Sequence, residues 1–462
     1  MVNEEDSMNS QNTQKCSAVW RIRRGMDRRF RSGHPWVYSN EIQDGMKGVL
    51  PGALIELQDA GGKFLARGYG NPHSLIAFRA LSRLPEVLDP LGEEFLFQAI
   101  SQAGHLRKSL GLQDLSHRLC YGEGDGLPGF ILDRFVLAAN SLQQVFVIQA
   151  HTAGADRILE KMERVLKRYV EEVQHAWNPS YRWDQTAILI RNDLAVRKME
   201  SLEEQAPQVI KALEGVDLNQ VQIVVPAVSQ SLPSLSFHVD LVQGQKTGFF
   251  LDQFNNIRIA FQDLHSSVIQ QVESRKQKTI QIVDLCCYVG QWGAQLAAAF
   301  RELGYSVEVT LVDASQRALD LAQKNVKAQG AQVRVLKGDV LKDLESLPSQ
   351  GFDMVISDPP AFIKSRKDIA VGTHAYLQLN TQAFRVVKNQ GSVVCCSCSA
   401  LLEEESFLQV FAKASRRNQV QIQWVGRGFQ SPDHPARAEF PEGRYLKSWM
   451  GVCQTTDMRK DG

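Results

Sequence analysis

The second half of the chain repeats one pattern, in which a short apolar run ends near an acidic residue and an amphipathic segment follows. The apolar runs that we predict as strands are residues 280–285, 306–312, 332–336, 354–357 and 392–396. Buried strands that alternate with helices are typical of a parallel sheet covered by helices on both faces. The sequence therefore predicts an α/β fold, with a Rossmann-like sheet in this part of the chain.

Acidic residues stand at the ends of the first four predicted strands. Asp284 and Asp313 lie at the ends of the first two, and Asp339 and Asp358 follow the third and fourth. Taken singly, such a residue is more often a turn or helix-capping residue. Ligands of these sheets, however, bind at the carboxyl ends of the strands, where an acid can accept hydrogen bonds from ribose hydroxyls. Four acids in this order predict a site for a nucleoside-containing cofactor.

A glycine-containing turn, Cys286-Cys-Tyr-Val-Gly-Gln-Trp-Gly293, follows the first predicted strand. Gly290 lets a ligand approach the backbone closely. The turn lacks the three-glycine dinucleotide fingerprint, which disfavours NAD.

Together, the turn and the acids resemble the class I S-adenosylmethionine-dependent methyltransferases. On that resemblance Asp284 and Gly290 line the methionine side of S-adenosylmethionine, Asp313 holds its ribose and Asp339 reads its adenine. The remaining cofactor contacts that we predict are Gln253, Tyr288, Val340 and Asp358.

Two loops bear on what receives the methyl group. The first is Asp358-Pro-Pro-Ala-Phe362, whose prolines hold the chain extended and aim the Asp358 carboxylate into the cleft. In nucleobase methyltransferases this loop contacts the target base, and an aromatic residue directly after the prolines suits methylation of an exocyclic amine. Here Ala361 takes that place and Phe362 comes one residue later, which weakens the amine interpretation.

The second loop contains Cys398, which the last predicted strand delivers to the same edge of the sheet. Carbon 5 of cytosine is a poor nucleophile until a thiolate adds to carbon 6, and an acid at ring nitrogen 3 assists this addition. We therefore predict Cys398 as the nucleophile and Asp358 as the acid that contacts the base. The alternatives are a buried structural cysteine or, with Cys395, half of a zinc site. The chain offers no second ligand pair at suitable spacing, so we predict no metal.

Several segments, spread from about residue 19 to 452, resemble the ribosomal RNA large subunit methyltransferase I family. The segments that carry this resemblance are 34–39, 122–129, 244–253, 358–362, 397–399 and 440–447. The resemblance implies synthesis of 5-methylcytosine in bacterial 23S ribosomal RNA. Two positions depart from the family pattern, since Gln291 replaces a glycine and Ala361 replaces a common lysine.

Two other functions remain open at this point. Relatives that share most of these segments include guanine-N7 enzymes, so the chain is alternatively a methyltransferase for guanine or another RNA base, with Cys398 structural. The other alternative is a non-catalytic RNA-binding assembly factor, which the complete set of cofactor acids disfavours.

The N-terminal region concentrates arginine beside aromatic residues. Short β-rich pieces at residues 52–59, 65–69 and 75–78 follow, and the module resembles a PUA domain, a small RNA-binding barrel. A solvated charged face is the alternative for such a run of arginines. The RNA contacts that we predict are Arg21, Arg23, Arg24, Arg28, His34 and Trp36, with Lys246 and Phe362 from the second half.

A chain of 462 residues exceeds the size of one hydrophobic core. We predict a disordered tail (1–17), a PUA-like domain (18–97), a small α/β middle domain (98–232) and the methyltransferase domain (233–462). The glycine-rich segment 122–129 is interpreted as a turn between domains, since no P-loop lysine follows it. The eight cysteines fit reduced thiols, and no apolar run is long enough for a bilayer. We expect a cytoplasmic protein that acts on ribosomal RNA, with a homodimer as an open possibility.

Overall fold

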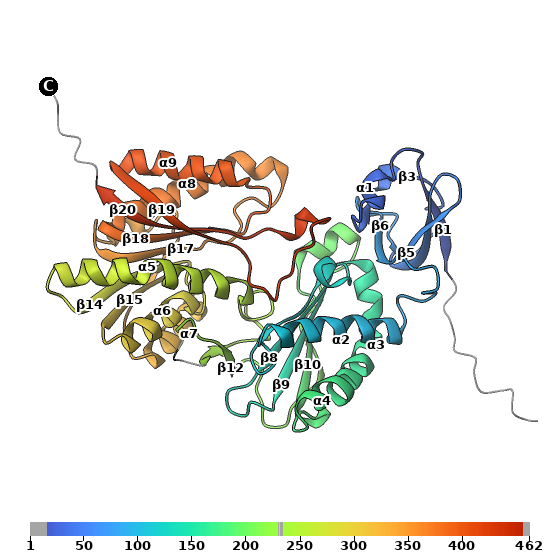
Figure 1. The fold of residues 1–462 in the computed structure, drawn as a ribbon, viewed down its shortest axis with the longest axis horizontal. Coiled ribbons are helices and arrows are strands. Elements are labelled where there is room, and N and C mark those ends of the chain that lie inside the picture. Colours follow the sequence, from blue (N-terminus) through green and yellow to red (C-terminus); the bar gives the residue numbers. More distant parts are fainter. Residues whose placement is uncertain (1–15, 230, 232–233, 456–462) are drawn as a thin grey trace, which may run out of the picture. The chain divides into compact units, whose positions relative to one another are not determined.

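The computed structural model describes residues 16–229, 231 and 234–455 (Figure 1). The predicted tail therefore lies almost entirely outside the described residues. The chain divides into two compact units. The N-terminal unit contains Met1–Asn219, Leu241–Gly248 and Asp433–Gly443, and the C-terminal unit contains Gln220–Asp240, Phe249–Pro432 and Arg444–Gly462.

The first sheet of the N-terminal unit has six strands in the order β2-β6-β5-β4-β1-β3. It encloses a core that includes Trp20, Phe30 and Phe78. The strand expected at 75–78 is wrong in extent, because residues 72–77 form a turn closed by the Asn71 N–H to the Ala77 carbonyl. The bounds are β1 Ala18–Ile22, α1 Arg28–Arg31, β2 Trp36–Val37, β3 Ile42–Asp44, β4 Ala53–Gln58, β5 Phe64–Gly70 and β6 Phe78–Ser82.

The second sheet of this unit has five strands in the order β11-β10-β9-β8-β7. The glycine-rich segment 122–129 connects β7 to β8 within this sheet, so its interpretation as a turn between domains is corrected. Gly126 and Gly129 adopt φ of 82° and 67° there, which favours glycine. The bounds are α2 Glu93–Ser109, β7 His117–Tyr121, β8 Phe130–Val136, β9 Gln144–Ala150, α3 Ala153–Arg168, α4 His175–Trp177, β10 Thr186–Ile190 and β11 Gln208–Lys211.

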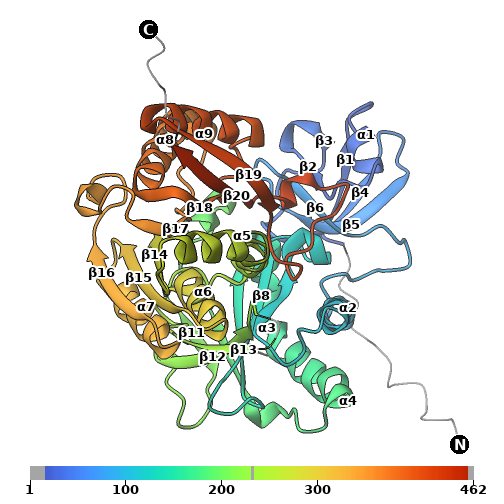
Figure 2. The ribbon, with the colours of Figure 1, turned by 60° about the vertical axis from the view of Figure 1, so that its left-hand side comes forward.

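The C-terminal unit contains a seven-stranded sheet in the order β16-β15-β14-β17-β18-β20-β19 (Figure 2). All five strands predicted from the sequence are present. The expectation of a parallel sheet needs a correction, since β20 pairs antiparallel with both β18 and β19. The strand bounds are β14 Thr279–Leu285, β15 Ser306–Asp313, β16 Gln332–Lys337, β17 Phe352–Ser357, β18 Val387–Ser397, β19 Val420–Gly428 and β20 Lys447–Thr455.

Helices cover both faces of this sheet, with α5, α6 and α7 on one face and α8 and α9 on the other (Figure 1). The long helix α5 was not among the elements predicted from the sequence, and its buried residues include Ile257, Leu264 and Val268. A hairpin of β12 (Val221–Pro226) and β13 (Ser234–Val239) precedes it. The helix bounds are α5 Phe254–Ser274, α6 Gln291–Glu302, α7 Gln316–Ala328, α8 Ile369–Val386 and α9 Glu404–Asn418.

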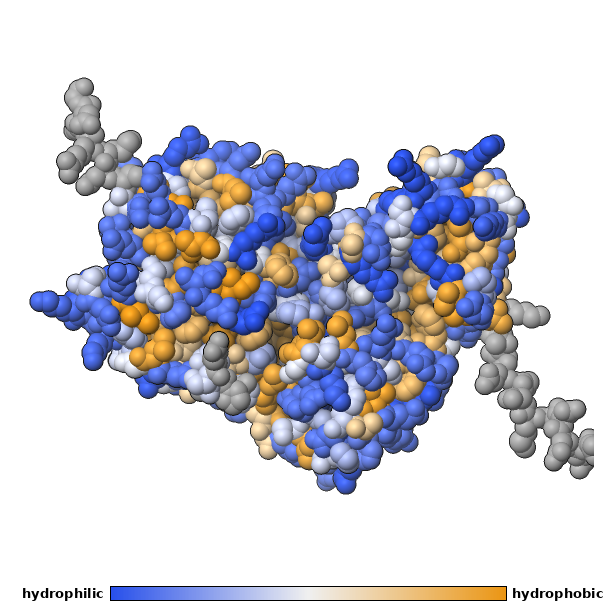
Figure 3. Space-filling view, viewed as in Figure 1, coloured by the Kyte–Doolittle hydropathy of each residue, from blue (hydrophilic) through white to orange (hydrophobic). Residues whose placement is uncertain are grey.

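Apolar side chains on the visible face of the C-terminal unit form small separate groups among hydrophilic ones (Figure 3). Among the described residues, no helix combines the length and apolar character that crossing a membrane requires.

Candidate functional site

The carboxyl ends of four strands of the C-terminal unit lie in register. Leu285 of β14 pairs with Val312 of β15 and with Ser357 of β17, and Asp313 pairs with Lys337 of β16. The loops that follow these strands therefore begin at one edge of the sheet. This register brings the loops bearing Tyr288, Gly290, Asp339 and Asp358 to the strand ends that hold Asp284 and Asp313.

Asp284 is completely buried at this edge. The Gly293 N–H donates to its Oδ2 over 3.1 Å, whereas its Oδ1 has no hydrogen-bond partner within the described part of the chain. Burial raises the pKa of Asp284 to about 8 against the lowering effect of the Gly293 bond, and the charges of Asp358 and Asp313 add to the rise. A buried carboxylate oxygen without a partner indicates a missing cationic or hydrogen-bond-donating group.

Asp313 holds the glycine-containing turn in place. The Tyr288 N–H donates to Asp313 Oδ2, and the Ser315 N–H donates to Oδ1, both over 2.9 Å. Tyr288 has a φ of 48°, an unusual conformation for a residue with a side chain, and its ring meets Phe250 edge-on at 5.0 Å. The backbone of the turn is thus fixed around the carboxylate that was predicted to hold a ribose.

Gly290 caps the N-terminus of α6 with a φ of 78°. A Cβ at this position would lie 3.0 Å from the Ala322 Cα and Cβ on α7. Both the left-handed backbone and the close approach of α7 require glycine here. The first turn of α6 therefore presents its N–H groups beside the buried Asp284.

Asp339 is more exposed than the other acids, at 42% of its side-chain area. The Leu341 N–H donates to its Oδ1 over 2.9 Å, which lowers the pKa of Asp339, and Lys342 lies 3.2 Å from its Oδ2. The neighbouring Val340 is buried. Asp339 therefore stays ionised at the rim, where it can accept a hydrogen bond from an amino group.

Two side chains that come from distant segments orient Asp358. The Gln253 Nε2 donates to Asp358 Oδ1 over 2.8 Å, and the Trp292 Nε1 donates to Oδ2 over 3.0 Å. Asn256 donates to Gln253 Oε1 over 2.7 Å and so fixes which end of the Gln253 amide faces Asp358. Gln253, predicted as a cofactor contact, is thus placed against the carboxylate of the Asp358 loop.

The turn that contains Cys398 packs against that same loop. The Cys398 thiol is partly exposed and contacts the Pro359 carbonyl at 3.8 Å. Ser399 Oγ accepts from the Ile363 N–H over 3.1 Å and bonds to the Tyr376 hydroxyl over 2.9 Å. Cys395 and Cys396, by contrast, are buried in β18, where burial raises the pKa of both thiols. Among these three cysteines, Cys398 alone is accessible.

Lys447 lies beside the Cys398 turn because β20 pairs with β18, which sets Lys447 opposite Ser397. Its ammonium donates to the Ser399 and Tyr445 carbonyls, both over 3.1 Å. Burial lowers the pKa of Lys447, while interaction with Cys398 opposes that shift. The arrangement therefore sets a positive charge next to the thiol.

The predicted RNA contacts of the N-terminal unit differ in exposure: the arginines are exposed, whereas His34 and Trp36 pack against neighbouring side chains. Arg21 pairs with Asp44 at 3.8 Å, Arg23 donates to the Ile42 carbonyl, and Arg24 and Arg28 are exposed. His34 is 4% exposed and bonds to Arg29 and Glu442, and Trp36 donates to Glu123 over 2.8 Å. His34 and Trp36 are thus packed into the unit, whereas the arginines line its surface.

The remaining two predicted RNA contacts lie on loops. Lys246 is exposed, with a φ of 51°. Its neighbour Thr247 donates to the buried Asp133, which attaches this segment to the second sheet. Phe362 in the C-terminal unit is half-buried against Tyr376, with ring centroids 4.9 Å apart.

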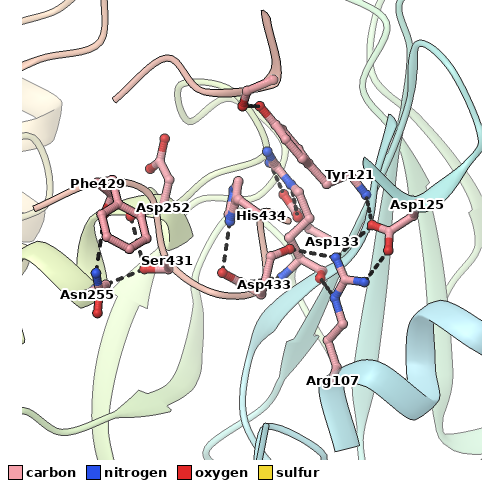
Figure 4. A network of polar contacts seen from close by, with 12 residues as sticks. Arg107, Tyr121, Asp125, Asp133, Asp252, Asn255, Phe429, Ser431, Asp433 and His434 are labelled. Atoms are coloured by element: carbon pink, nitrogen blue, oxygen red, sulfur yellow. Dashed lines mark hydrogen bonds and ion pairs between the residues drawn. The ribbon is translucent and has the colours of Figure 1, made fainter. Parts of the chain in front are cut away.

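Polar contacts also hold the segment Asp433–Gly443 in the N-terminal unit (Figure 4). Arg107 pairs with Asp125 at 2.5 Å and donates to the Asp433 carbonyl over 2.6 Å. The Asp433 carboxylate accepts from the Arg118 N–H and contacts His434, each at 2.8 Å. In the C-terminal unit, Ser431 accepts from the Asn255 N–H over 2.9 Å. Each of these contacts lies within one unit.

Comparison with known proteins supports both the N-terminal PUA-like domain and the C-terminal methyltransferase domain. Residues 21–83 match the PUA-like domain, and residues 263–422 match the methyltransferase small domain. Ribosomal RNA large subunit methyltransferase I from Serratia proteamaculans is 29% identical over 435 residues, which cover 93% of this chain and 97% of that protein. The protein of that name from Photobacterium profundum is 28% identical, with 92% and 97% covered. The chain is related to ribosomal RNA large subunit methyltransferase I.

Solved structures support the fold of this ribosomal RNA methyltransferase relative. A protein of Streptococcus mutans, described as a SAM-dependent methyltransferase, superposes with a TM-score of 0.66 at 15% identity, over 94% of this chain and 99% of its own. A methyltransferase solved in complex with SAH gives a TM-score of 0.67 at 15% identity, with the same shares covered. Both the PUA-like module and the mixed α/β sheet are thus present in this chain.

Three residues of this site, Trp292, Tyr376 and Lys447, were not predicted from the sequence. Trp292 lies inside the predicted turn, and Lys447 lies inside a segment that carried the family resemblance. Their roles depend on contacts with Asp358 and the Cys398 turn, and chain spacing does not encode these contacts. Within the described residues, no three His, Cys, Asp or Glu side chains group as metal ligands.

Proposed function

We propose that the protein is an S-adenosylmethionine-dependent methyltransferase that makes 5-methylcytosine in large-subunit ribosomal RNA through a covalent adduct on Cys398. The observation that carries the methyl-donor site is the unpartnered Oδ1 of the buried Asp284, set among three further acids at one sheet edge. The relatives named ribosomal RNA large subunit methyltransferase I, which align over nearly the whole chain, support ribosomal RNA as the acceptor.

The residues at the sheet edge fit S-adenosylmethionine. The ammonium group of its methionine part would neutralise Asp284, whose ionised form is costly in its buried position. Asp313 would accept from the ribose hydroxyls, and Asp339 from the adenine amino group. Gly290, Tyr288 and Val340 would surround the cofactor through backbone and apolar contacts. When bound, the cofactor supplies a methyl group on a positively charged sulfur, which is the electrophile.

Cys398 provides the nucleophile that cytosine chemistry needs. Its thiolate adds to carbon 6 of the ring, so that the electron pair of the carbon 5–carbon 6 double bond makes carbon 5 nucleophilic. Once carbon 5 carries the methyl group, a base removes its proton, the double bond forms again and the thiolate leaves. The partly exposed position of Cys398 supports this role, because the cytosine ring must reach the sulfur.

Lys447 supports Cys398 through its charge. Its ammonium group, held by the Ser399 and Tyr445 carbonyls, favours the thiolate over the neutral thiol. We therefore assign Lys447 as a positioning residue that raises the reactive fraction of Cys398.

We assign Asp358 to the contact with the target base. Gln253 and Trp292 hold its carboxylate with one donor on each oxygen. A preorganised carboxylate at ring nitrogen 3 stabilises the charge that thiolate addition places on the ring. The proposed substrate would place the protein with ribosomes in the cytoplasm. RNA contacts by the N-terminal arginines are a further part of the proposal, and so is a homodimer.

The test is transfer of a labelled methyl group from S-adenosylmethionine to bacterial large-subunit ribosomal RNA, followed by identification of the modified nucleoside by mass spectrometry. We expect 5-methylcytidine. Methylguanosine would exclude the cytosine assignment, and cofactor binding without transfer to any RNA would instead indicate an assembly factor.

The covalent step has its own test, with RNA that carries 5-fluorocytidine. Fluorine at carbon 5 blocks release, so the protein should stay attached to this RNA under denaturing conditions. Cys398→Ala should abolish both the adduct and the activity. Cys395→Ala is the matched control, since Cys395 lies buried in β18, the strand that leads into the Cys398 turn. Full activity of Cys398→Ala would refute the covalent mechanism.

A further inference from the structure

A short basic segment follows the Asp358 loop and has no part in the site described so far. Lys364, Arg366 and Lys367 are all exposed, and they lie within four residues. Throughout the described portion of the chain, none of the three takes part in an ion pair or a side-chain hydrogen bond. We call these three residues the basic loop.

The arginine-rich surface of the N-terminal unit differs from the basic loop in part, because three of its arginines form ion pairs, whereas Arg24 and Arg28 form none among the described residues. There, Arg21 pairs with Asp44, Arg29 with Glu41, and Arg31 with Asp27 and Asp59. In the basic loop the neighbouring Asp368 accepts instead from the Ser365 hydroxyl, over 2.6 Å. Three like charges in so short a segment repel one another, and an anion that binds them relieves the repulsion.

The basic loop is attached directly to the turn of the proposed nucleophile. The Ile363 N–H donates to Ser399 Oγ, and Phe362 packs on Tyr376, whose hydroxyl also bonds to Ser399. A fully extended chain advances at most about 3.5 Å per residue, so Lys367 lies within roughly 14 Å of that attachment. Phosphates that flank a nucleotide bound at Cys398 therefore fall within reach of these long side chains.

The end of the basic loop continues into the N-terminus of α8. This helix has eighteen residues and no acidic residue in its first turn. The 3₁₀ turn Arg366–Asp368 leads directly into the helix, and the Ile369 N–H donates to the Arg366 carbonyl. The N-terminus of a helix carries partial positive charge and favours phosphate.

We propose that Lys364, Arg366 and Lys367 bind the phosphates of the RNA strand beside the target nucleotide. The inference rests on the proposed function and adds to it the surface that holds the substrate. Phosphate contacts of this kind fix the register of the strand and carry no base specificity. The basic loop thus holds the strand, while Asp358 and Cys398 act on the base.

The experiment compares two triple variants that remove the same charge. K364Q/R366Q/K367Q removes the basic loop, and K413Q/R416Q/R417Q removes three exposed cations near the end of α9. Affinity for a single-stranded ribosomal RNA fragment is measured by fluorescence anisotropy at 0.05–0.5 M salt, together with the KM for RNA and the Kd for the cofactor.

Three lost phosphate contacts should lower the slope of log Kd against log salt by about 2. The loss of affinity in the basic-loop variant should then be about 100-fold larger at 0.05 M salt than at 0.5 M salt, with a matching rise in KM at low salt. Its cofactor Kd should not change. The α9 variant should keep the wild-type slope.

A wild-type slope and KM in the basic-loop variant would overturn the inference. Equal losses in the two triple variants would overturn it as well, because they would indicate a general effect of net charge. Failure of the proposed function looks different, since the wild type would then bind RNA through the basic loop without methylating it.

Discussion

Replacement of Asp284 by asparagine should stabilise the cofactor-free protein while it weakens cofactor binding. The side chain is completely buried, and the pKa of its carboxyl group is raised to about 8. Asparagine has the same shape and keeps an oxygen that accepts from the Gly293 N–H. The substitution therefore removes the cost of ionisation and leaves the packing in place.

The size of the effect follows from the pKa. A folded-state pKa above the unfolded value of about 3.9 means that stability is fully present at low pH and is lost as pH rises through the folded value. For a pKa of about 8 in Asp284, the wild type should lose roughly 1.4 kcal/mol per pH unit between about pH 4 and 8. The advantage of the Asn variant should thus be near zero at pH 4 and reach an upper limit of about 6 kcal/mol above pH 8.

Urea unfolding followed by far-ultraviolet circular dichroism at pH 4 to 9 measures this difference, and contributions common to both proteins cancel. Isothermal titration calorimetry gives the Kd for S-adenosylmethionine, which should rise about 10- to 100-fold because a charge-assisted hydrogen bond of about 2 kcal/mol is lost. A stability difference that stays constant with pH would refute the assignment of the pKa. Unchanged cofactor affinity would refute the role of Asp284 as the partner of the methionine ammonium.

Three further perturbations test other contacts of the site. Lys447→Gln should move the acidic limb of the rate–pH profile to higher pH, because the thiolate of Cys398 loses its neighbouring charge, whereas Lys447→Arg should restore the profile in part. Gly290→Ala should cost about 1–2 kcal/mol of stability from its φ of 78° and weaken cofactor binding in titration calorimetry. Gln253→Leu should lower kcat/KM about tenfold or more, since a hydrogen bond to the Asp358 carboxylate is worth about 1.5–3 kcal/mol, and unchanged steady-state kinetics would exclude this role.

The sequence predicts best those site residues whose positions depend on the nearby sequence, namely the four acids at the strand ends. Asp284, Asp313, Asp339 and Asp358 were placed by their positions at the ends of apolar runs. The register of the sheet turns these spacings into a common edge. In a parallel sheet, the order of strand ends is a property of the chain itself, so one sequence suffices to predict it.

Long-range pairing accounts for most of what was missed. The antiparallel strand β20 comes last in the chain but inserts between β18 and β19, and only that insertion sets Lys447 opposite Ser397. Gln253 likewise reaches Asp358 across 105 residues of sequence. Neither apolar periodicity nor a motif encodes such neighbours, because both contacts depend on the tertiary arrangement of elements that are far apart in sequence.

The predicted RNA-binding residues also depend on contacts that the sequence does not encode. The sequence and the structure favour different cations for this role. Density of arginine drew the prediction to residues 21–31, yet density alone does not say which charges already have partners. Arg21, Arg29 and Arg31 form ion pairs within their unit, whereas Lys364, Arg366 and Lys367 form none in the described portion of the chain. An ion-paired arginine must give up part of its interaction before it binds phosphate, and an unpaired lysine need not. Per charge, the basic loop should therefore contribute more to RNA affinity than the longer arginine run.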